Sequence, residues 1–342
     1  MMMLSNSYLL GFCNFEKAAT PATLGFQLFV FAAVAVSAVL LPKMLNRVWL
    51  RFLLMSVGVL LFELFTGPMW HNYRLGEWAY VYHDVSWILT IGWTALILGV
   101  VTICDRLLSS WYEWKRFPVY LGVLTVIGFL LEILVVNIGI RGYAPQTLAM
   151  LSGVQIAGVP IEALYYIPVF MSLVICFYKY WSFILVDQRP LIPLKHRNWG
   201  RSFLLAFLGI FLFEVMIEPM VKNEQFPTWS YIFHDITVVL TGLFILIVGL
   251  VAAIIGKFFS HYPTPIRFFI ALGLASAIAL PTEAWFINHG YRIYQENVTH
   301  QYLGYTLPLL NVPIELLFGV LLYMTLVIVF IRYWETILDN WI

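Results

Sequence analysis

The sequence predicts an all-α, polytopic membrane protein of about nine transmembrane helices, with one N-terminal helix followed by two four-helix repeats of parallel topology. Three observations predict this fold class. Of the 342 residues, 62% are hydrophobic and only 11% are charged, whereas about a quarter of the residues are charged in soluble domains. Apolar runs of roughly 18–20 residues recur, and this length is enough to cross a bilayer. A large part of the chain also repeats at a constant offset, which indicates duplicated bundles.

The same composition excludes several other classes of protein. Disordered chains have low hydrophobicity, so the apolar content excludes disorder. A nucleic-acid binder is excluded because 19 basic and 18 acidic residues nearly balance and leave no basic surface for phosphates. The three cysteines (Cys13, Cys104 and Cys176) are isolated and predict no disulfide framework. No cleavable signal peptide is evident, so the first spanning helix is expected to direct membrane insertion.

The apolar runs place the spans, and the basic residues between them predict orientation. Fourteen Lys and Arg residues fall in the connections on one side and five on the other. The basic side is expected in the cytoplasm, which puts the N-terminus outside and the C-terminus inside, in the inner (plasma) membrane of a bacterium. The expected spans are 24–41, 49–66, 86–104, 118–136, 159–183, 202–220, 235–255, 267–286 and 313–331.

An offset of 151 residues relates the two halves of the chain. Residues 62–84 align without gaps on 213–235, and the same offset carries the segment from Glu132 to Tyr143 onto the segment from Glu283 to Tyr294. After a two-residue insertion, Val-Pro-Ile-Glu recurs at offset 153. An even number of crossings gives both copies one topology. The expected domains are an N-terminal outer segment with the first helix (1–47), repeat 1 (48–190) and repeat 2 (198–342). Within each repeat, a weaker pattern is suggested to occur twice: a helix that ends in Glu, an aromatic loop with Asn, and a helix that opens on an acid.

The carboxylates are few, and eight of them occupy equivalent places near the outer ends of the spans. A charged group within a membrane is costly unless it is paired or faces a polar cavity. We therefore expect all eight to face one lipid-shielded chamber around the pseudo-symmetry axis and to form the catalytic set. These residues are Glu63, Asp84, Glu132, Glu162, Glu214, Asp235, Glu283 and Glu315.

Two alternatives remain for these acids. Asp84, Asp235, Glu162 and Glu315 fall in expected first helical turns, where an acid can simply cap the helix, and Pro160 and Pro313 also suit a helix start. The other four lie near helix C-termini, where an acid opposes the helix dipole. They could instead bond an Asn or Trp of the following loop.

Burial and like-charge neighbours favour a protonated carboxyl group, and a neutral acid beside an apolar pocket can act as a general acid. Aromatic rings of the outer loops can stabilise a cation, although Trp and Tyr are also ordinary interfacial anchors. No metal site or cofactor is expected, because no helical HxxH or HExxH spacing and no GxGxxG motif occurs. The expected substrate-binding residues are Asn72, Trp78, Tyr80, His83, Asn137, Tyr143, Asn223, Trp229, Tyr231, His234, Asn288 and Tyr294.

Two segments carry a resemblance to a known family. In Asn137-x-Gly-x-Arg-x-Tyr followed by Gly-Val-Pro-Ile-Glu162, and in its copy from Asn288 to Glu315, the sequence resembles the membrane-embedded lycopene cyclase family of tandem domains. The resemblance implies redox-neutral ring closure at the end of a linear carotenoid or similar isoprenoid. It marks Glu162 and Glu315 as motif acids, and Glu132 and Glu283 as helix-end acids. The family's second motif glutamate is Ala163 in the first copy and Leu316 in the second, which indicates a divergent member. A changed substrate, or a related acid-catalysed step such as alkene hydration, isomerisation or cyclisation of another terpenoid, therefore stays open.

Together these features predict an integral-membrane, acid-catalysed isoprenoid- or carotenoid-modifying enzyme, an intramolecular lyase or isomerase. Its expected partners are an apolar isoprenoid or lipid substrate and the bilayer, without nucleic acid. The main alternative is a proton-coupled transporter with a central carboxylate site, since repeated halves and intramembrane acids suit transport as well. A non-catalytic assembly factor that docks through the outer polar cluster is a third possibility.

Overall fold

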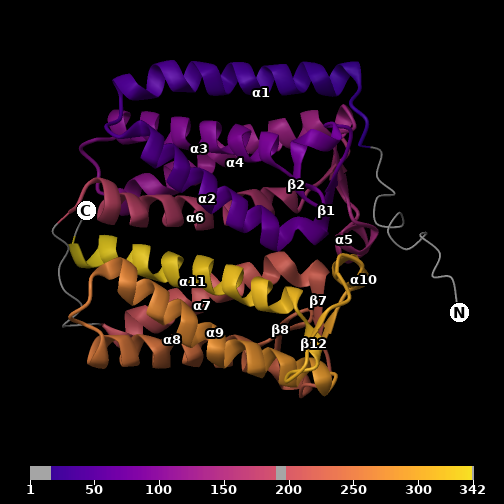
Figure 1. Ribbon diagram of the computed structural model, residues 1–342, viewed down its shortest axis with the longest axis vertical. Coiled ribbons are helices and arrows are strands. Elements are labelled where there is room, and N and C mark those ends of the chain that lie inside the picture. Colours follow the sequence, from indigo (N-terminus) through magenta and orange to yellow (C-terminus); the bar gives the residue numbers. More distant parts are fainter. Residues whose placement is uncertain (1–16, 190–197, 341–342) are drawn as a thin grey trace, which may run out of the picture.

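The computed structural model describes residues 17–189 and 198–340 and confirms an all-α polytopic membrane protein. Within these ranges, nine helices are long and apolar enough to cross a membrane, and they lie side by side in Figure 1. Each coincides with an expected span to within a few residues, although α4 begins five residues earlier and α11 ends nine residues later than expected. They are α1 (Pro21–Leu40), α2 (Val48–Thr66), α3 (Trp87–Leu107), α4 (Glu113–Asn137), α6 (Ala163–Trp181), α7 (Trp199–Ile217), α8 (Val238–Phe258), α9 (Thr264–Asn288) and α11 (Glu315–Asn340).

Parts of the expected domains, residues 1–16, 190 and 341–342, lie outside the described residues, and so does Cys13. Elsewhere the ends of the helices have local causes. The helix α1 begins at Pro21 because Thr20 and Thr23 form a reciprocal capping box. The helix α6 continues into a π-helical turn, η4 (Ser182–Val186). Single-turn 3₁₀ helices are η1 (Leu41–Lys43), η2 (Gly67–Met69), η3 (Glu77–Ala79), η6 (Glu218–Met220) and η7 (Thr228–Ser230).

The connections that carry the short strands gather at one end of the bundle, which we call the loop end (Figure 1). Short strands form there, and the sequence did not predict them. Two pairs join distant loops, namely β1 (Trp70–Asn72) with β4 (Arg141–Tyr143) and β7 (Val221–Asn223) with β10 (Arg292–Tyr294). Four hairpins complete the set: β2 (Tyr80–Tyr82) with β3 (Val85–Ser86), β5 (Gln155–Ile156) with β6 (Val159–Pro160), β8 (Tyr231–Phe233) with β9 (Ile236–Thr237), and β11 (Thr306–Leu307) with β12 (Val312–Pro313). Two short helices, α5 (Pro145–Met150) and α10 (Glu296–Thr299), also lie there.

These hairpins correct the expected positions of four residues. Asp84 and Asp235 lie in hairpin turns, three residues before α3 and α8 begin, so the first-turn capping interpretation is wrong for both. Pro160 and Pro313 lie in strands β6 and β12 and not in helices. The sequence predicts a span that begins at residue 159. The helix α6 begins at Ala163 instead, because residues 159 and 160 form strand β6.

In each of the four hairpins, one asparagine of a preceding helix or strand forms a hydrogen bond to the hairpin turn. This shared contact explains why a similar pattern with one asparagine occurs twice within each repeat. The side-chain nitrogens of Asn72 and Asn137 donate to the carbonyls of Asp84 and Ala157 at 2.6 and 2.9 Å. The nitrogens of Asn223 and Asn288 donate to the carbonyls of Asp235 and Leu310 at 2.8 and 2.9 Å. All four expected substrate-binding asparagines therefore have a structural role at the loop end.

The two bundles pack against each other through α6 and α11 at the centre of the molecule, while α1 packs outside on α3 (Figure 1). Aromatic rings fill this boundary near the loop end. Phe62 of α2 lies 4.5 Å from Phe170 and 6.4 Å from Phe213 between ring centroids, and Phe213 stacks on Tyr323 at 5.1 Å. Phe62 and Phe213 are fully or almost fully buried, so the boundary is an apolar core.

Candidate functional site

Two buried carboxylates of repeat 1 form the centre of the candidate site. Glu63 lies near the loop end of α2, and Glu132 lies near the loop end of α4; they are 7% and 6% exposed. The hydroxyl of Thr90, on α3, donates to Glu63 Oε2 at 2.5 Å. Glu132 accepts a hydrogen bond from the Tyr143 hydroxyl at 2.8 Å and pairs with Arg141 Nη1 at 3.4 Å. One acid is thus bonded to a neutral group, and the other is paired with a cation.

Both acids line one cavity of about 50 Å³, which we call the acid cavity. Arg141 and Tyr143 complete its polar wall, and Arg141 also lies 5.4 Å from the centre of the Trp70 ring. The remaining wall is largely aromatic. Its rings are Phe62, Trp70, Trp93, Tyr166 and Phe170.

A second and larger cavity, which we call the apolar cavity, has a volume of about 380 Å³ and lies between α1, α3 and α4. Its walls are mostly aliphatic and aromatic side chains of these helices. It shares Trp93, Glu132 and Arg141 with the acid cavity, so these three residues separate the two spaces. Sites for small molecules in proteins have volumes of about 300–1000 Å³ and a few polar groups in an apolar wall, and the apolar cavity fits this description.

The corresponding acids of repeat 2 are packed more tightly. Glu214 accepts a hydrogen bond from Thr241 at 2.5 Å, as Glu63 does from Thr90. Glu283 lies 2.5 Å from Arg292 Nε and accepts from the Tyr294 hydroxyl at 2.8 Å. The cavity beside them has a volume of only about 10 Å³, and its lining includes Glu214, Asp235 and Arg292. That volume holds about one water molecule.

The structure therefore corrects the expectation that eight acids face one chamber. The described cavities place Glu63 and Glu132 in one site and Glu214 and Asp235 in another, and Glu162 and Glu315 line neither. The physical reason is the aromatic packing at the boundary between the bundles, which occupies the expected central space.

Asp84 belongs to the loop end rather than to the acid cavity. Its carboxylate lies 2.9 Å from His71 Nδ1 and is buried. Asp235 has no histidine at the equivalent position, which is Lys222, and His234 pairs instead with Glu218 at 3.2 Å. These two acids are thus held differently in the two repeats.

Glu162 and Glu315 each hold the loop that precedes their helix. Glu162 Oε1 accepts from the backbone nitrogen of Ser152 at 2.8 Å, and Glu315 Oε1 accepts from that of Leu303 at 2.6 Å. Partial burial raises the pKa of Glu162, but the hydrogen bonds from Ser152 outweigh it, and the net pKa lies below the usual value. Such a carboxyl stays ionised and is a poor proton donor at neutral pH.

Most expected substrate-binding residues lie away from the acid cavity. Trp78 and Trp229 are 55% and 76% exposed, and the hydroxyls of Tyr80 and Tyr231 donate to the carbonyls of Asn72 and Asn223. The exceptions are Tyr143, which lines the acid cavity, and its counterpart Tyr294, which bonds Glu283. Burial and the adjacent Glu132 raise the pKa of Tyr143, so this phenol remains a hydrogen-bond donor.

Sequence reasoning missed three kinds of residue in the site: the cations Arg141 and Arg292, the hydroxyl donors Thr90 and Thr241, and the ring of Trp93. The 151-residue offset relates both arginines and both threonines. Their occurrence at equivalent positions in both repeats was the sequence signal that could have identified them. In the described ranges, no three His, Cys, Asp or Glu side chains lie together in a way that could hold a metal ion.

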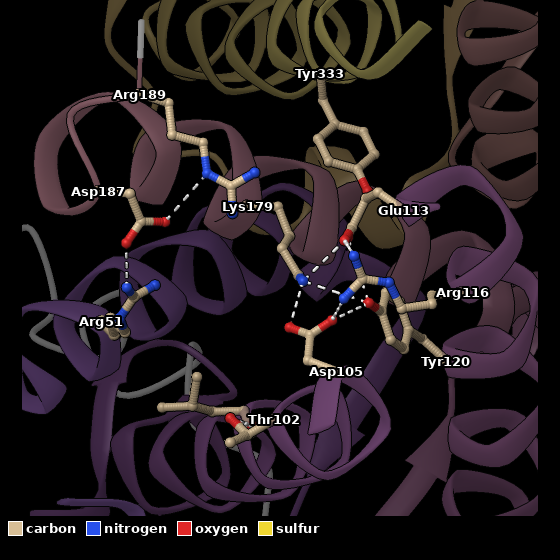
Figure 2. A network of polar contacts seen from close by, with 11 residues as sticks. Arg51, Thr102, Asp105, Glu113, Arg116, Tyr120, Lys179, Asp187, Arg189 and Tyr333 are labelled. Carbon is tan, nitrogen blue, oxygen red and sulfur yellow. Dashed lines mark hydrogen bonds and ion pairs between the residues drawn. The ribbon is translucent and has the colours of Figure 1, made fainter. Parts of the chain in front are cut away.

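A second polar group, which we call the ion-pair cluster, lies at the opposite end of the bundle, where α3 ends and α4 begins. Figure 2 shows its side chains, of which Lys179 and Glu113 are buried. Lys179 Nζ lies 2.6 Å from Asp105 and 3.0 Å from Glu113, and Arg116 lies 2.9 Å from Asp105 and 3.3 Å from Glu113. The Tyr120 hydroxyl also donates to Asp105. Tyr333, from repeat 2, donates to Glu113 at 3.1 Å. The two acids and two bases of the cluster balance in charge. The hydrogen bond from Tyr333 links the cluster to repeat 2.

Comparison with family models, curated proteins and solved structures finds no match to this chain. The structure itself defines the class: an integral-membrane protein of long apolar helices, with a buried acid pair beside an apolar cavity.

Proposed function

We propose that the protein is an acid-catalysed enzyme that modifies an isoprenoid, in the manner of the membrane-embedded lycopene cyclases, and that repeat 1 carries the reaction. One observation carries the proposal: the acid pair of Glu63 and Glu132 adjoins a cavity of about 380 Å³ with apolar walls. A long apolar chain could lie between α1, α3 and α4 while its end reaches the acid cavity past Trp93.

Glu63 is assigned as the proton donor. Among the described residues it forms no ion pair, and its partner Thr90 is a neutral hydroxyl. Burial favours the neutral acid that proton donation requires, and the Arg141 cation of the same cavity is paired with Glu132. Glu132 is assigned as the carboxylate that stabilises the cation and accepts a proton, because Arg141 and Tyr143 hold it in place.

The proposed reaction is redox-neutral. Glu63 gives its proton to one carbon of a terminal double bond, which leaves a tertiary carbocation at the other carbon. The electron pair of a second double bond then closes a ring, and Glu132 removes a proton to restore a double bond. Transfer of that proton back to Glu63 completes the cycle. Aromatic faces such as those of Trp93, Phe170 and Tyr166 line the cavity and can stabilise the cation.

Repeat 1 is favoured over repeat 2 because its site has room for a substrate. The corresponding cavity in repeat 2 is about 10 Å³, and Arg292 holds Glu283 at 2.5 Å. In the described ranges, no helix packs on α8 in the way that α1 packs on α3, and α1 stands outside the duplication. The motif acids marked by the resemblance, Glu162 and Glu315, are assigned to loop stabilisation.

The proposed location is a bacterial inner membrane, with the loop end at the outer face and the ion-pair cluster toward the cytoplasm. The support for this orientation is the excess of Lys and Arg in the connections of the opposite end. A proton-coupled transporter remains the alternative prediction. The aromatic core between the repeats supports chemistry over passage of a solute, since it fills the central space.

The test compares Glu63→Gln with Glu214→Gln, its matched variant in repeat 2. Each protein is expressed in cells that accumulate linear carotenoids, and lipid extracts are separated and analysed by mass spectrometry. The unchanged protein is expected to yield an isomer of equal mass with fewer double bonds. Loss of a general acid costs about 10²–10⁴-fold in rate, so Glu63→Gln is expected to abolish the product, while Glu214→Gln retains most of it. An extract that the well-expressed protein leaves unchanged would contradict the proposal.

A further inference from the structure

The two repeats differ at the end of the bundle that carries the ion-pair cluster. The offset that relates the repeats carries Arg116 onto Arg267 and Lys179 onto Arg332, so both basic positions are kept. The other members of the cluster are lost. Asp105, Glu113 and Tyr120 correspond to Gly256, Thr264 and Ala271.

A cavity of about 70 Å³ lies where the lost side chains would be. It is lined by Arg267 and Arg332 together with Thr264 and Ala271, and by Tyr180 of repeat 1. Tyr180 is the counterpart of Tyr333, which donates to Glu113 in the other copy. The volume is several times the roughly 10–15 Å³ that one water molecule requires. The site thus keeps the cations and one tyrosine of the cluster but not its anions.

The charges in this cavity do not balance. Arg332 forms an ion pair with the buried Glu335, to which Ser202 also donates. Arg267 has a neutral partner, the Thr264 hydroxyl at 2.9 Å, and its Nε is buried without a hydrogen-bond partner among the described residues. Among the described residues, Arg267, Arg332 and Glu335 therefore sum to one net positive charge. In repeat 1 the equivalent cluster is neutral.

We propose that this cavity binds one phosphate-type oxyanion, between Arg267 and Arg332, and that the anion takes the place of the carboxylates lost from repeat 2. Arginine binds phosphate oxygens through charge-assisted hydrogen bonds. The remaining walls are aliphatic side chains of α8, α9 and α11, including Val251, Ile255 and Ile328. An acyl chain could pack on them, so a phospholipid headgroup satisfies both parts of the site, in agreement with the binding of anionic lipids by basic pockets between spanning helices.

The experiment uses the full chain in nanodiscs of phosphatidylcholine, with phosphatidylglycerol titrated in as the lipid probe. A parallel arm adds inorganic phosphate to protein in pure phosphatidylcholine. Thermal stability and native mass spectrometry report binding. We expect phosphatidylglycerol to raise the apparent Tm and to remain bound through detergent release. Stabilisation by inorganic phosphate alone would identify a soluble anion as the source.

Thr264→Glu is the decisive variant, because it restores at the first residue of α9 the acid that Glu113 supplies at the first residue of α4. It is expected to weaken phosphatidylglycerol binding by about tenfold or more, and Arg267→Gln should do the same. Lys257→Gln is the matched control, since it removes an exposed charge near the same end of α8, and it should leave binding unchanged. Equal binding by the unchanged protein and Thr264→Glu, or no binding of either probe, would overturn the proposal.

Discussion

Replacement of Lys179 tests whether the ion-pair cluster holds the two repeats together. Lys179→Met keeps the length of the side chain but removes the ammonium group that lies within 3.0 Å of both Asp105 and Glu113. Removal of one partner from a buried ion pair costs about 3–5 kcal/mol, because the other charge is left uncompensated. Arg116 still contacts both acids, and the Asp105 side chain is 30% exposed. The expected loss is therefore near the lower limit, at about 3 kcal/mol.

This loss should lower the apparent Tm of the purified protein by roughly 5–10 °C, measured by intrinsic fluorescence with light scattering. Lys115→Met is the control, because Lys115 is exposed and contacts only the ring faces of Tyr112 and Trp114 among the described interactions. Adding Glu113→Gln to Lys179→Met should recover part of the loss, since it removes one of the uncompensated charges. A Tm of Lys179→Met equal to that of Lys115→Met would refute the reasoning.

Two further predictions concern packing and pH. Gly209→Ala should lower the free energy of unfolding by about 1–3 kcal/mol, because the added carbon would lie 2.7 Å from the Phe330 ring. In Gly242→Ala, the control, the added carbon has no neighbouring atom within 4 Å. Thermal melts should show this variant to be neutral or slightly stabilised. Burial lowers the pKa of His83, so its loop is most stable above the unfolded pKa of about 6.5 and loses stability as the pH falls below that value. Hydrogen exchange of residues 77–86, corrected for intrinsic rates, should show weaker protection at pH 5 than at pH 7, and His83→Gln should remove this difference.

The helices could be predicted from the sequence because a span is determined by a long apolar run, which few other structures share. The strands could not. A pair such as β5 and β6 has two residues in each strand, too few for an alternating pattern to appear. Residues with positive φ in the turns, such as His83 and His234, also gave no signal, since they are not glycine.

The candidate site was predicted in part, because depth in the membrane follows from position along a helix but packing partners do not. The order of residues placed Glu63 and Glu132 near the same end of their helices. Whether they meet Glu214 and Glu283 depends on which helices lie at the boundary, and there Phe62, Phe213 and Tyr323 fill the space. The ion-pair cluster was overlooked for a similar reason. Lys179 and Arg116 belong to the basic residues whose distribution predicts orientation, but both also pair with Asp105 of the neighbouring helix α3.

The two repeats have diverged in opposite senses at their two ends. At the loop end, repeat 1 has an open cavity beside Glu63 and Glu132, while Arg292 closes the copy in repeat 2. At the other end, ion pairs around Lys179 fill repeat 1, while the copy around Arg267 is open. Each bundle thus keeps one tightly paired end. Because a cavity forfeits packing energy in proportion to its volume, a bundle that is open at both ends would be the least stable arrangement. Among the described cavities, those of repeat 1 lie at or toward the loop end and the larger one of repeat 2 lies at the opposite end, so neither bundle carries the packing cost of large cavities at both ends.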